Sequence, residues 1–350
     1  MLDVSARLSA LVAFAVAAHG QAAPRSAKTI LRDFDRVAMP SMSDGSDPES
    51  VRRFRDAIDA GCTRKAELAA ELQRCHPDHA RLPAVLAIRW AGMTNALGKA
   101  AAVAQEVEAL LQQQGLRDDV RTQAVLALAR ARLAVPTCTN EARLEAIEQA
   151  MALDGGRDHA DFTAACLVDF VEQHVADPTT QRALLETAVR HWPDNAYGGR
   201  PARRWLHVLG MLGTPFVDQL PAEKRDWFTV AAADAPEFTV VQVWTGWIAN
   251  DGVDEQIEAL LALRREFGTS VRLLGLLNGD LEDRLPAAQA AGVDWPQTDI
   301  RDPEPMTCPF GAPKSRLYFV LDRDLTIAGV VGHAAAVPAR LHQLRSAVVR

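Results

Sequence analysis

The sequence lacks an excess of positive charge. Its 45 acidic side chains outnumber its 38 basic ones, so the formal net charge is -7 at pH 7. Proteins that bind a phosphate backbone or an anionic lipid leaflet present a broad cationic surface. The composition therefore argues against nucleic acid and against the membrane surface as partners.

Several motifs with a known chemistry are also missing. There is no phosphate-binding glycine loop, no nucleophile elbow with an ordered Ser-His-Asp set, and no pair of metal-binding histidines on one predicted helix. The segment Cys75-His76-Pro77-Asp78-His79 has ligand-type side chains, but it contains one thiol and lies at a predicted turn. We therefore expect no metal site and no cofactor.

Long apolar runs are absent after Ala23, because charged residues interrupt every hydrophobic stretch. Near the N-terminus, Arg7 precedes an apolar run from Leu8 to Ala18, and small residues follow as far as Ala23. This pattern is typical of a secretory signal peptide. We expect residues 1–23 to be cleaved and the mature chain to be exported, to the periplasm or outside the cell, without membrane insertion.

Cysteine is scarce and its count is odd, with thiols at Cys62, Cys75, Cys138, Cys166 and Cys308. An exported compartment would permit disulfides, but at least one thiol stays unpaired within the chain. Cys62 and Cys75 flank one predicted helix, which makes a bond between them geometrically awkward.

The length of 350 residues favours two domains, each with a core of its own. In the first domain, acidic turns recur, because Asp78, Asp118, Asp154 and Asp194 lie 40, 36 and 40 residues apart. Each interval holds two helical patterns, as in arrays of helix hairpins. We predict a linker or extended segment over residues 24–46, followed by an α-helical repeat domain of the α-solenoid type over residues 47–209.

The second helix of each predicted unit carries apolar residues at helical spacing, as in Val103, Val107 and Leu110, in Leu144, Ile147 and Met151, and in Leu184, Leu185 and Val189. The segments Ala146 to Asp154 and Ala183 to Asn195 resemble the second helix and turn of tetratricopeptide repeats. Such stacks usually serve as concave interaction surfaces. A purely structural helical cap is the alternative.

The second domain, residues 210–350, has a different periodicity. Apolar and β-branched runs predict strands at Phe238 to Trp244, Val271 to Leu277, Leu317 to Leu321 and Thr326 to Val331. Helical patterns lie between them and after them, at Val253 to Phe267, Leu281 to Ala291 and Ala335 to Val348. The order predicts an α/β domain in which a parallel strand-helix-strand unit precedes a hairpin and a closing helix.

Three segments give this domain a resemblance to the TlpA-like branch of the thioredoxin-fold oxidoreductases. They are Val240-Val241-Gln242-Val243-Trp244-Thr245-Gly246-Trp247, Gly292-Val293-Asp294-Trp295-Pro296 and Gly311-Ala312-Pro313. The resemblance covers roughly the last 140 residues and implies a thioredoxin-like α/β fold.

The same resemblance places a Cys-x-x-Cys pair directly after the second tryptophan, where the first thiolate attacks a disulfide. This chain has Ile248-Ala249-Asn250-Asp251 instead. Neither isoleucine nor aspartate can exchange with a disulfide, so the dithiol chemistry is unavailable there. We interpret Asp251 first as a helix cap.

We therefore assign no catalytic residue and predict a non-catalytic polypeptide-binding or scaffold protein of the cell envelope. The predicted binding groove consists of Trp244, Trp247, Ile248, Asp251 and Pro313. Pro313 is placed here because the resemblance implies a cis-proline near that position, beside the active-site helix.

Two alternatives stay open. Cys308 lies five residues before Pro313 and could act as a single redox thiol, which would make the protein a thiol-disulfide oxidoreductase-like enzyme. Alternatively, the C-terminal domain only stabilises the helical array and binds nothing.

Overall fold

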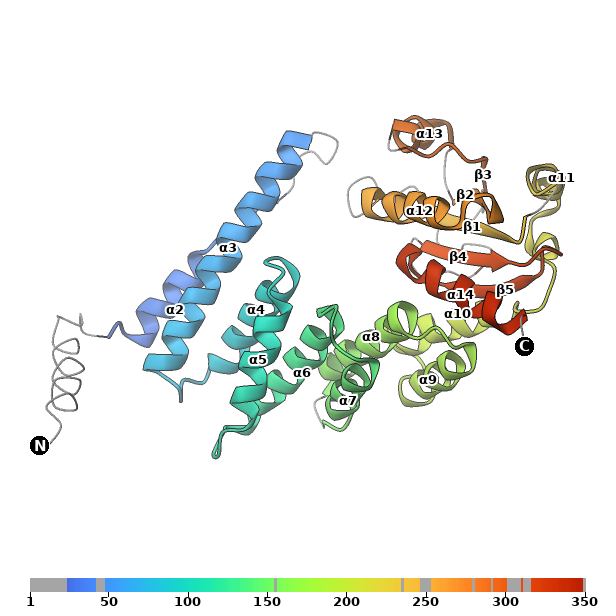
Figure 1. Ribbon diagram of the computed structural model, residues 1–350. Helices are drawn as coiled ribbons and strands as arrows, with labels where there is room; N and C mark the ends of the chain where they lie inside the picture. Colours follow the sequence, from blue (N-terminus) through green and yellow to red (C-terminus); the bar gives the residue numbers. More distant parts are fainter. Residues whose placement is uncertain are drawn as a thin grey trace, which may run out of the picture.

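The computed structural model describes residues 24–41, 48–153, 156–233, 236–245, 253–278, 281–290, 292–300, 310 and 316–348. Figure 1 shows a series of helices that leads from the N-terminal side to an α/β domain at the C-terminal side. Within the described residues, no helix combines the length and the apolar character that crossing a bilayer requires. The predicted signal peptide lies outside these residues.

The helical part begins earlier than predicted, with α2 (Ala27–Arg36) packed on the long helix α3 (Pro48–Cys75). The expectation of a linker or extended segment over residues 24–46 is wrong for α2, because Ile30, Leu31 and Phe34 form an apolar stripe that is buried. The Ser26 side chain caps the helix by accepting from the Thr29 amide at 3.2 Å.

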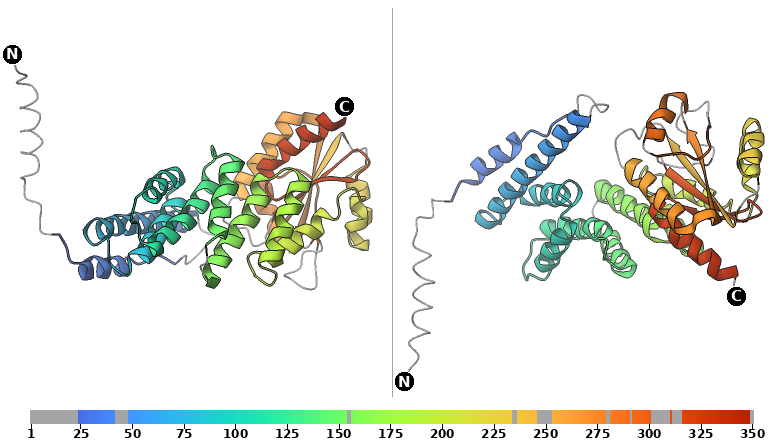
Figure 2. Two further views of the ribbon diagram at one scale, coloured as in Figure 1. Left: turned by 90° about the horizontal axis from the view of Figure 1, so that it is seen from below. Right: turned by 45° about the horizontal axis from the view of Figure 1, so that its top comes forward.

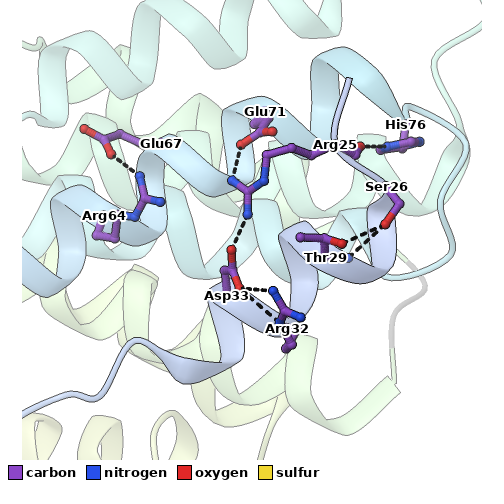
Figure 3. Close-up of polar contacts among 9 residues, drawn as sticks. All are labelled: Arg25, Ser26, Thr29, Arg32, Asp33, Arg64, Glu67, Glu71 and His76. Carbon is purple, nitrogen blue, oxygen red and sulfur yellow. Dashed lines mark hydrogen bonds and ion pairs between the residues drawn. The ribbon is translucent and has the colours of Figure 1, made fainter. Parts of the chain in front are cut away.

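Charged side chains fix this first helix pair, as Figure 3 shows. Arg25 forms ion pairs with Asp33 of α2 and with Glu71 of α3, the latter at 3.0 Å. His76 Nε2 lies 2.8 Å from the Arg25 carbonyl, to which it donates. The segment before α2 is therefore attached to the C-terminal end of α3.

Seven further helices follow: α4 (Leu82–Asn95), α5 (Ala100–Leu111), α6 (Asp118–Ala134), α7 (Asn140–Met151), α8 (Gly156–His174), α9 (Pro178–His191) and α10 (Gly199–Leu209). Each packs on its neighbour in sequence, and α4, α6, α8 and α10 also contact one another in succession. The apolar stripes predicted for the second helices lie in α5, α7 and α9, where Val103, Val107, Ile147 and Leu185 are buried. Asp78 and Asp194 lie in turns before α4 and α10, and Asp118 is the first residue of α6, whereas Asp154 lies outside the described residues.

Two of these turns are in direct contact. Arg117, at the start of α6, donates to the carbonyls of Pro77 and His79 at 3.2 and 3.1 Å. These carbonyls lie in the turn before α4, so one guanidinium joins two turns that are a full predicted period apart.

The α/β domain contains one five-stranded sheet in the order β3-β2-β1-β4-β5. Its strands are β1 (Phe238–Thr245), β2 (Val271–Asn278), β3 (Gln297–Asp299), β4 (Arg316–Leu321) and β5 (Ile327–Val331). The first three are parallel, whereas β4 runs antiparallel to β1 and pairs with β5 in a hairpin. The helices are α12 (Val253–Phe267), α13 (Leu281–Ala290) and α14 (Val337–Val348). The 3-10 turn η2 (Gly268–Ser270) follows α12, and the 3-10 turn η3 (Ala334–Ala336) precedes α14. This arrangement is thioredoxin-like, as predicted, and β3 is an additional strand.

The two faces of the sheet belong to different cores. Helices α12 and α14 cover one face, where Val240 and Val320 pack against α12 residues such as Leu260 and Leu263. Figure 2 shows these two helices on the same side of the sheet. The opposite face, with Val241 and its neighbours, belongs to a hydrophobic cluster that continues without interruption into the helical part. The α/β part therefore has one core of its own, between the sheet and helices α12 and α14, and shares a second core with the helical part.

The shared core is joined through residues 210–237, which contain η1 (Phe216–Gln219) and α11 (Ala222–Ala231). Phe216 is fully buried, and its ring lies 5.0 to 5.7 Å from the rings of Phe228, Phe310 and Phe319. Aromatic pairs at these separations add stability beyond the area that they bury.

Backbone hydrogen bonds extend this connection along β5. The Gly213 and Phe216 amides donate to the carbonyls of Ile327 and Leu325 at 2.9 and 3.0 Å, and the Ile327 amide donates to Thr214. Leu325 has a φ of 58°, so it occupies the left-handed region at the turn between β4 and β5. Asp322 holds that turn by accepting from the amides of Asp324 and Thr326.

Replacement of Phe216 by alanine tests the shared core. We expect Phe216→Ala to reduce the free energy of unfolding by about 3–5 kcal/mol, because it removes a fully buried ring and leaves a cavity. The unfolding transitions of the helical part and of the α/β part should also shift together to lower urea concentration. Urea denaturation followed by circular dichroism and by tryptophan fluorescence measures both. The control is Val230→Ala, since Val230 is 78% exposed and its loss should change stability by less than about 0.5 kcal/mol.

Candidate functional site

The groove predicted from the sequence can be assessed at one of its residues. Trp244 lies at the end of β1 with only 9% of its surface exposed, and its indole N–H donates to Gln297 Oε1 at 3.2 Å. Trp247, Ile248, Asp251 and Pro313 lie outside the described residues, as does Cys308. Trp244 is therefore buried: its ring belongs to the core that includes α12, and its one polar atom is bonded to β3.

A buried polar cluster lies close to the same end of the sheet. Gln256, in the first turns of α12, accepts with Oε1 from the Tyr318 hydroxyl and from the Ala334 amide, both at 3.0 Å. These two donors fix the orientation of the amide, so Nε2 must donate to His333 Nδ1, 3.2 Å away. Gln256 therefore holds α12 against β4 and against the segment after β5, and His333 carries no proton on Nδ1.

The helical part approaches the sheet next to this cluster. A Cβ atom added to Gly332 would lie 3.3 Å from Cβ of Glu172 in α8 and 3.6 Å from the ring of Trp205 in α10. Glycine therefore allows the end of β5 to lie close to both helices.

His174, the last residue of α8, is partly buried at this junction, and its Nε2 has no hydrogen-bond partner within the described part of the chain. Burial lowers the pKa of His174, and the positive charge of Arg143 lowers it further. The neutral imidazole is therefore the form that fits the folded protein.

A groove of about 960 Å³ crosses the helical part. It spans the successive helices α4, α6 and α8, which Figure 1 shows beside one another. Small and apolar side chains predominate in its lining, and Ile88 is 47% exposed within it. The lining comprises Ala80, Pro83, Ala84, Ala87, Ile88, Trp90, Ala91, Thr94, Asp119, Thr122, Gln123, Leu126, Ala127, Arg130, His159 and Phe162.

An ion pair behind the groove holds α4 in place. Glu106 of α5 accepts from Arg89 and, at 2.9 Å, from the indole N–H of the buried Trp90. Burial alone would raise the pKa of Glu106, but the hydrogen bonds from Arg89 and Trp90 keep this pKa below its usual value. The carboxylate stays ionised near neutral pH and joins α5 to α4.

Arg130 and Phe162 mark one end of the groove. The guanidinium carbon lies 5.6 Å from the centre of the Phe162 ring, within cation–π range. Both residues also line a smaller adjoining pocket of about 270 Å³, which contains Cys166 and Asp169. Burial raises the pKa of Cys166 to about 12, so this thiol is unreactive near neutral pH.

The other candidate residues of the sequence have structural roles where they are described. Cys62, Cys75, Cys138 and Cys166 are free thiols. In the histidine-containing turn, His76 bonds to the Arg25 carbonyl, and His79 Nδ1 accepts from the Arg81 amide at 3.1 Å. Among the described side chains, no group of three or more His, Cys, Asp or Glu residues could hold a metal ion.

Comparison with known proteins adds little to this description. No protein-family model matches the chain, and no curated protein matches it. Among solved structures, a thioredoxin-like protein from Bacteroides caccae ATCC 43185 is similar, with 12% sequence identity and a TM-score of 0.32. The similarity covers 69% of this chain and 93% of that chain. The thioredoxin-like assignment therefore rests on the order and directions of the strands.

Sequence reasoning did not locate the groove. Arg130 has no distinctive neighbour in sequence. The available signal was the run of small side chains at Ala84, Ala87 and Ala91, which follows one face of α4 and is preceded by Ala80 in the turn before the helix.

His174 predicts a pH dependence of stability. The pKa of His174 is lowered in the folded state, so the unfolded chain binds the proton more tightly. The free energy of unfolding is therefore unaffected by His174 well above the unfolded pKa of about 6.5, and it decreases as the pH falls below that value. We expect His174→Gln to lose less stability than the wild type between pH 7.5 and pH 5, as measured by urea denaturation at both pH values. His191→Gln, on an exposed histidine, serves as the control. An unchanged pH dependence in His174→Gln would contradict the assigned role.

Proposed function

We propose that this protein is an exported, non-catalytic polypeptide-binding protein of the cell envelope, and that the groove across α4, α6 and α8 is its binding surface. The observation that carries the proposal is the groove itself, with its volume of about 960 Å³ and a lining of small apolar side chains and a few polar ones. Concave sites of this composition bind apolar side chains and use a small number of polar groups to orient the ligand.

The dimensions suit an extended segment. Asp119 and Arg130 lie at opposite ends of the α6 wall, about 16 Å apart at the rise of an α-helix. About five residues of extended chain span that distance. Thr122 and Gln123 lie between these ends and could bond to the main chain of the ligand.

The form of the helical part also supports the proposal. We infer that α4 to α10 are a tetratricopeptide-like repeat array, because Asp78, Asp118 and Asp194 stand at or shortly before the starts of α4, α6 and α10 and because Arg117 joins two successive turns. Helix-hairpin arrays commonly bind partners on their concave side.

The α/β domain then acts as a rigid support rather than as an enzyme. We infer that it derives from the TlpA-like branch, since the segment around Trp244 matches that pattern, whereas Ile248 and Asp251 stand where a dithiol would be needed. The signal-peptide pattern of residues 1–23 supports a location of this domain and the groove outside the cytoplasm.

Photo-crosslinking tests the groove directly. With p-benzoylphenylalanine at position 88, in the groove, we expect polypeptide adducts in the exported fraction; at position 102, on the exposed side of α5, we expect none. The variant Ala87→Trp should abolish the adducts by filling the groove, because Ala87 lines it. Ala102→Trp is the matched control. Equal labelling at both positions, or adducts that survive Ala87→Trp, would refute the proposed surface.

Thiol mapping separates this function from the redox alternative. Under the binding hypothesis, Cys308 reacts with iodoacetamide at pH 7.5 no faster than Cys138. Cys166 should remain unmodified in the native protein because of its burial and raised pKa, and it serves as an internal reference. Mass spectrometry after a time course gives each rate. A Cys308 rate more than about tenfold above that of Cys138 would favour the single-cysteine redox protein.

A further inference from the structure

We propose that Arg130 forms an acidic-residue subsite at one end of the groove, so that the bound polypeptide carries an aspartate or glutamate flanked by apolar residues. This inference rests on the proposed function and specifies the chemistry of the ligand. Its basis is the distribution of charge along the groove together with the geometry at Arg130.

The groove contains two charged residues of opposite sign, and they differ in their partners. Asp119 is neutralised by Arg117, whose Nη2 lies 2.6 Å from its carboxylate, and it also accepts from the Val120 amide. Among the described residues, no carboxylate lies within ion-pair distance of Arg130. Within the described residues, the groove therefore presents one positive charge without an ion-pair partner, near the C-terminal end of α6.

The position of Arg130 suits recognition of a carboxylate. Its exposed guanidinium rests on the face of Phe162, 5.6 Å from the ring centre, which restricts its orientation while leaving its N–H donors for a ligand. A guanidinium held in this way can donate two parallel hydrogen bonds to a carboxylate. A lysine would provide the charge but could not donate two parallel hydrogen bonds from one planar group.

The surroundings of Arg130 determine the side from which a ligand arrives. On one side of Arg130 lies the smaller adjoining pocket, which Asp169 and Cys166 also line. On the other side of Arg130, the groove continues over Ala127 and Leu126, which are apolar. The favoured ligand therefore places its acidic side chain on Arg130 and its neighbouring apolar side chains along α6.

A phage-displayed library of random dodecapeptides, selected on the full chain, tests the subsite with an unbiased set of ligands. We expect selected peptides to be enriched in Asp or Glu at one aligned position beside apolar residues. For the strongest peptide and its counterpart with that acid changed to lysine, fluorescence anisotropy should show a preference of about tenfold or more for the acidic form.

Variants of Arg130 then assign the preference to one side chain. Arg130→Glu should reverse it, Arg130→Gln should remove it, and Arg130→Lys should retain a weaker form. Ala87→Trp should weaken both peptides, since it blocks the groove. Selected peptides that show no acidic preference, or a preference unchanged in Arg130→Glu, would overturn the subsite while leaving polypeptide binding intact. A selection that yields no peptide dependent on the open groove would count against both the subsite and the proposed function.

Discussion

The packing of Phe216 against Phe228, Phe310 and Phe319 is the interaction on which the rest of the structure depends. These rings belong to the connecting segment, to the loop before β4 and to β4 itself, so one cluster holds three distant parts of the chain together. The cluster is continuous with the core of α4 to α10. Because the array and the sheet bury apolar surface against each other, they cannot move as independent bodies without exposing it.

The groove depends on a different kind of packing. Ala84, Ala87 and Ala91 along one face of α4, with Ala80 in the turn before it, leave space beside the helix, while Arg89 and Trp90 bond to Glu106 of α5 and hold the helix in place. Large side chains at the alanine positions would close the space, and loss of the ion pair would loosen its wall. In a binding surface of this type, small side chains on a fixed helix leave a preformed groove. Few groups then lose conformational freedom when a ligand binds.

Local signals predicted much of the fold. Helix α12 was predicted with its observed bounds, Val253 to Phe267, and the strands near Val240 and Leu274 were identified because β-branched and apolar runs are unambiguous there. Helix α2 was missed because only three apolar residues define its buried face, and β3 because three residues give no periodicity. The shared core and the burial of Trp244 were not predictable, since both depend on contacts between segments that are far apart in sequence. The groove across the helical part depends in the same way on contacts among the three helices α4, α6 and α8. Of the candidate site predicted at the end of β1, Trp244 is the residue that lies within the described part of the chain.

The backbone contacts between residues 213–216 and the start of β5 have a further consequence. The outer side of β5 is an edge of the sheet, and an exposed edge offers unpaired amides and carbonyls to strands of other molecules. Here the chain that leaves the helical array occupies part of that edge itself, through Gly213, Thr214 and Phe216. Protection against edge-to-edge association is therefore supplied by the preceding segment, so a fragment that began at β1 would have an uncovered edge and an uncovered apolar face on the same strands.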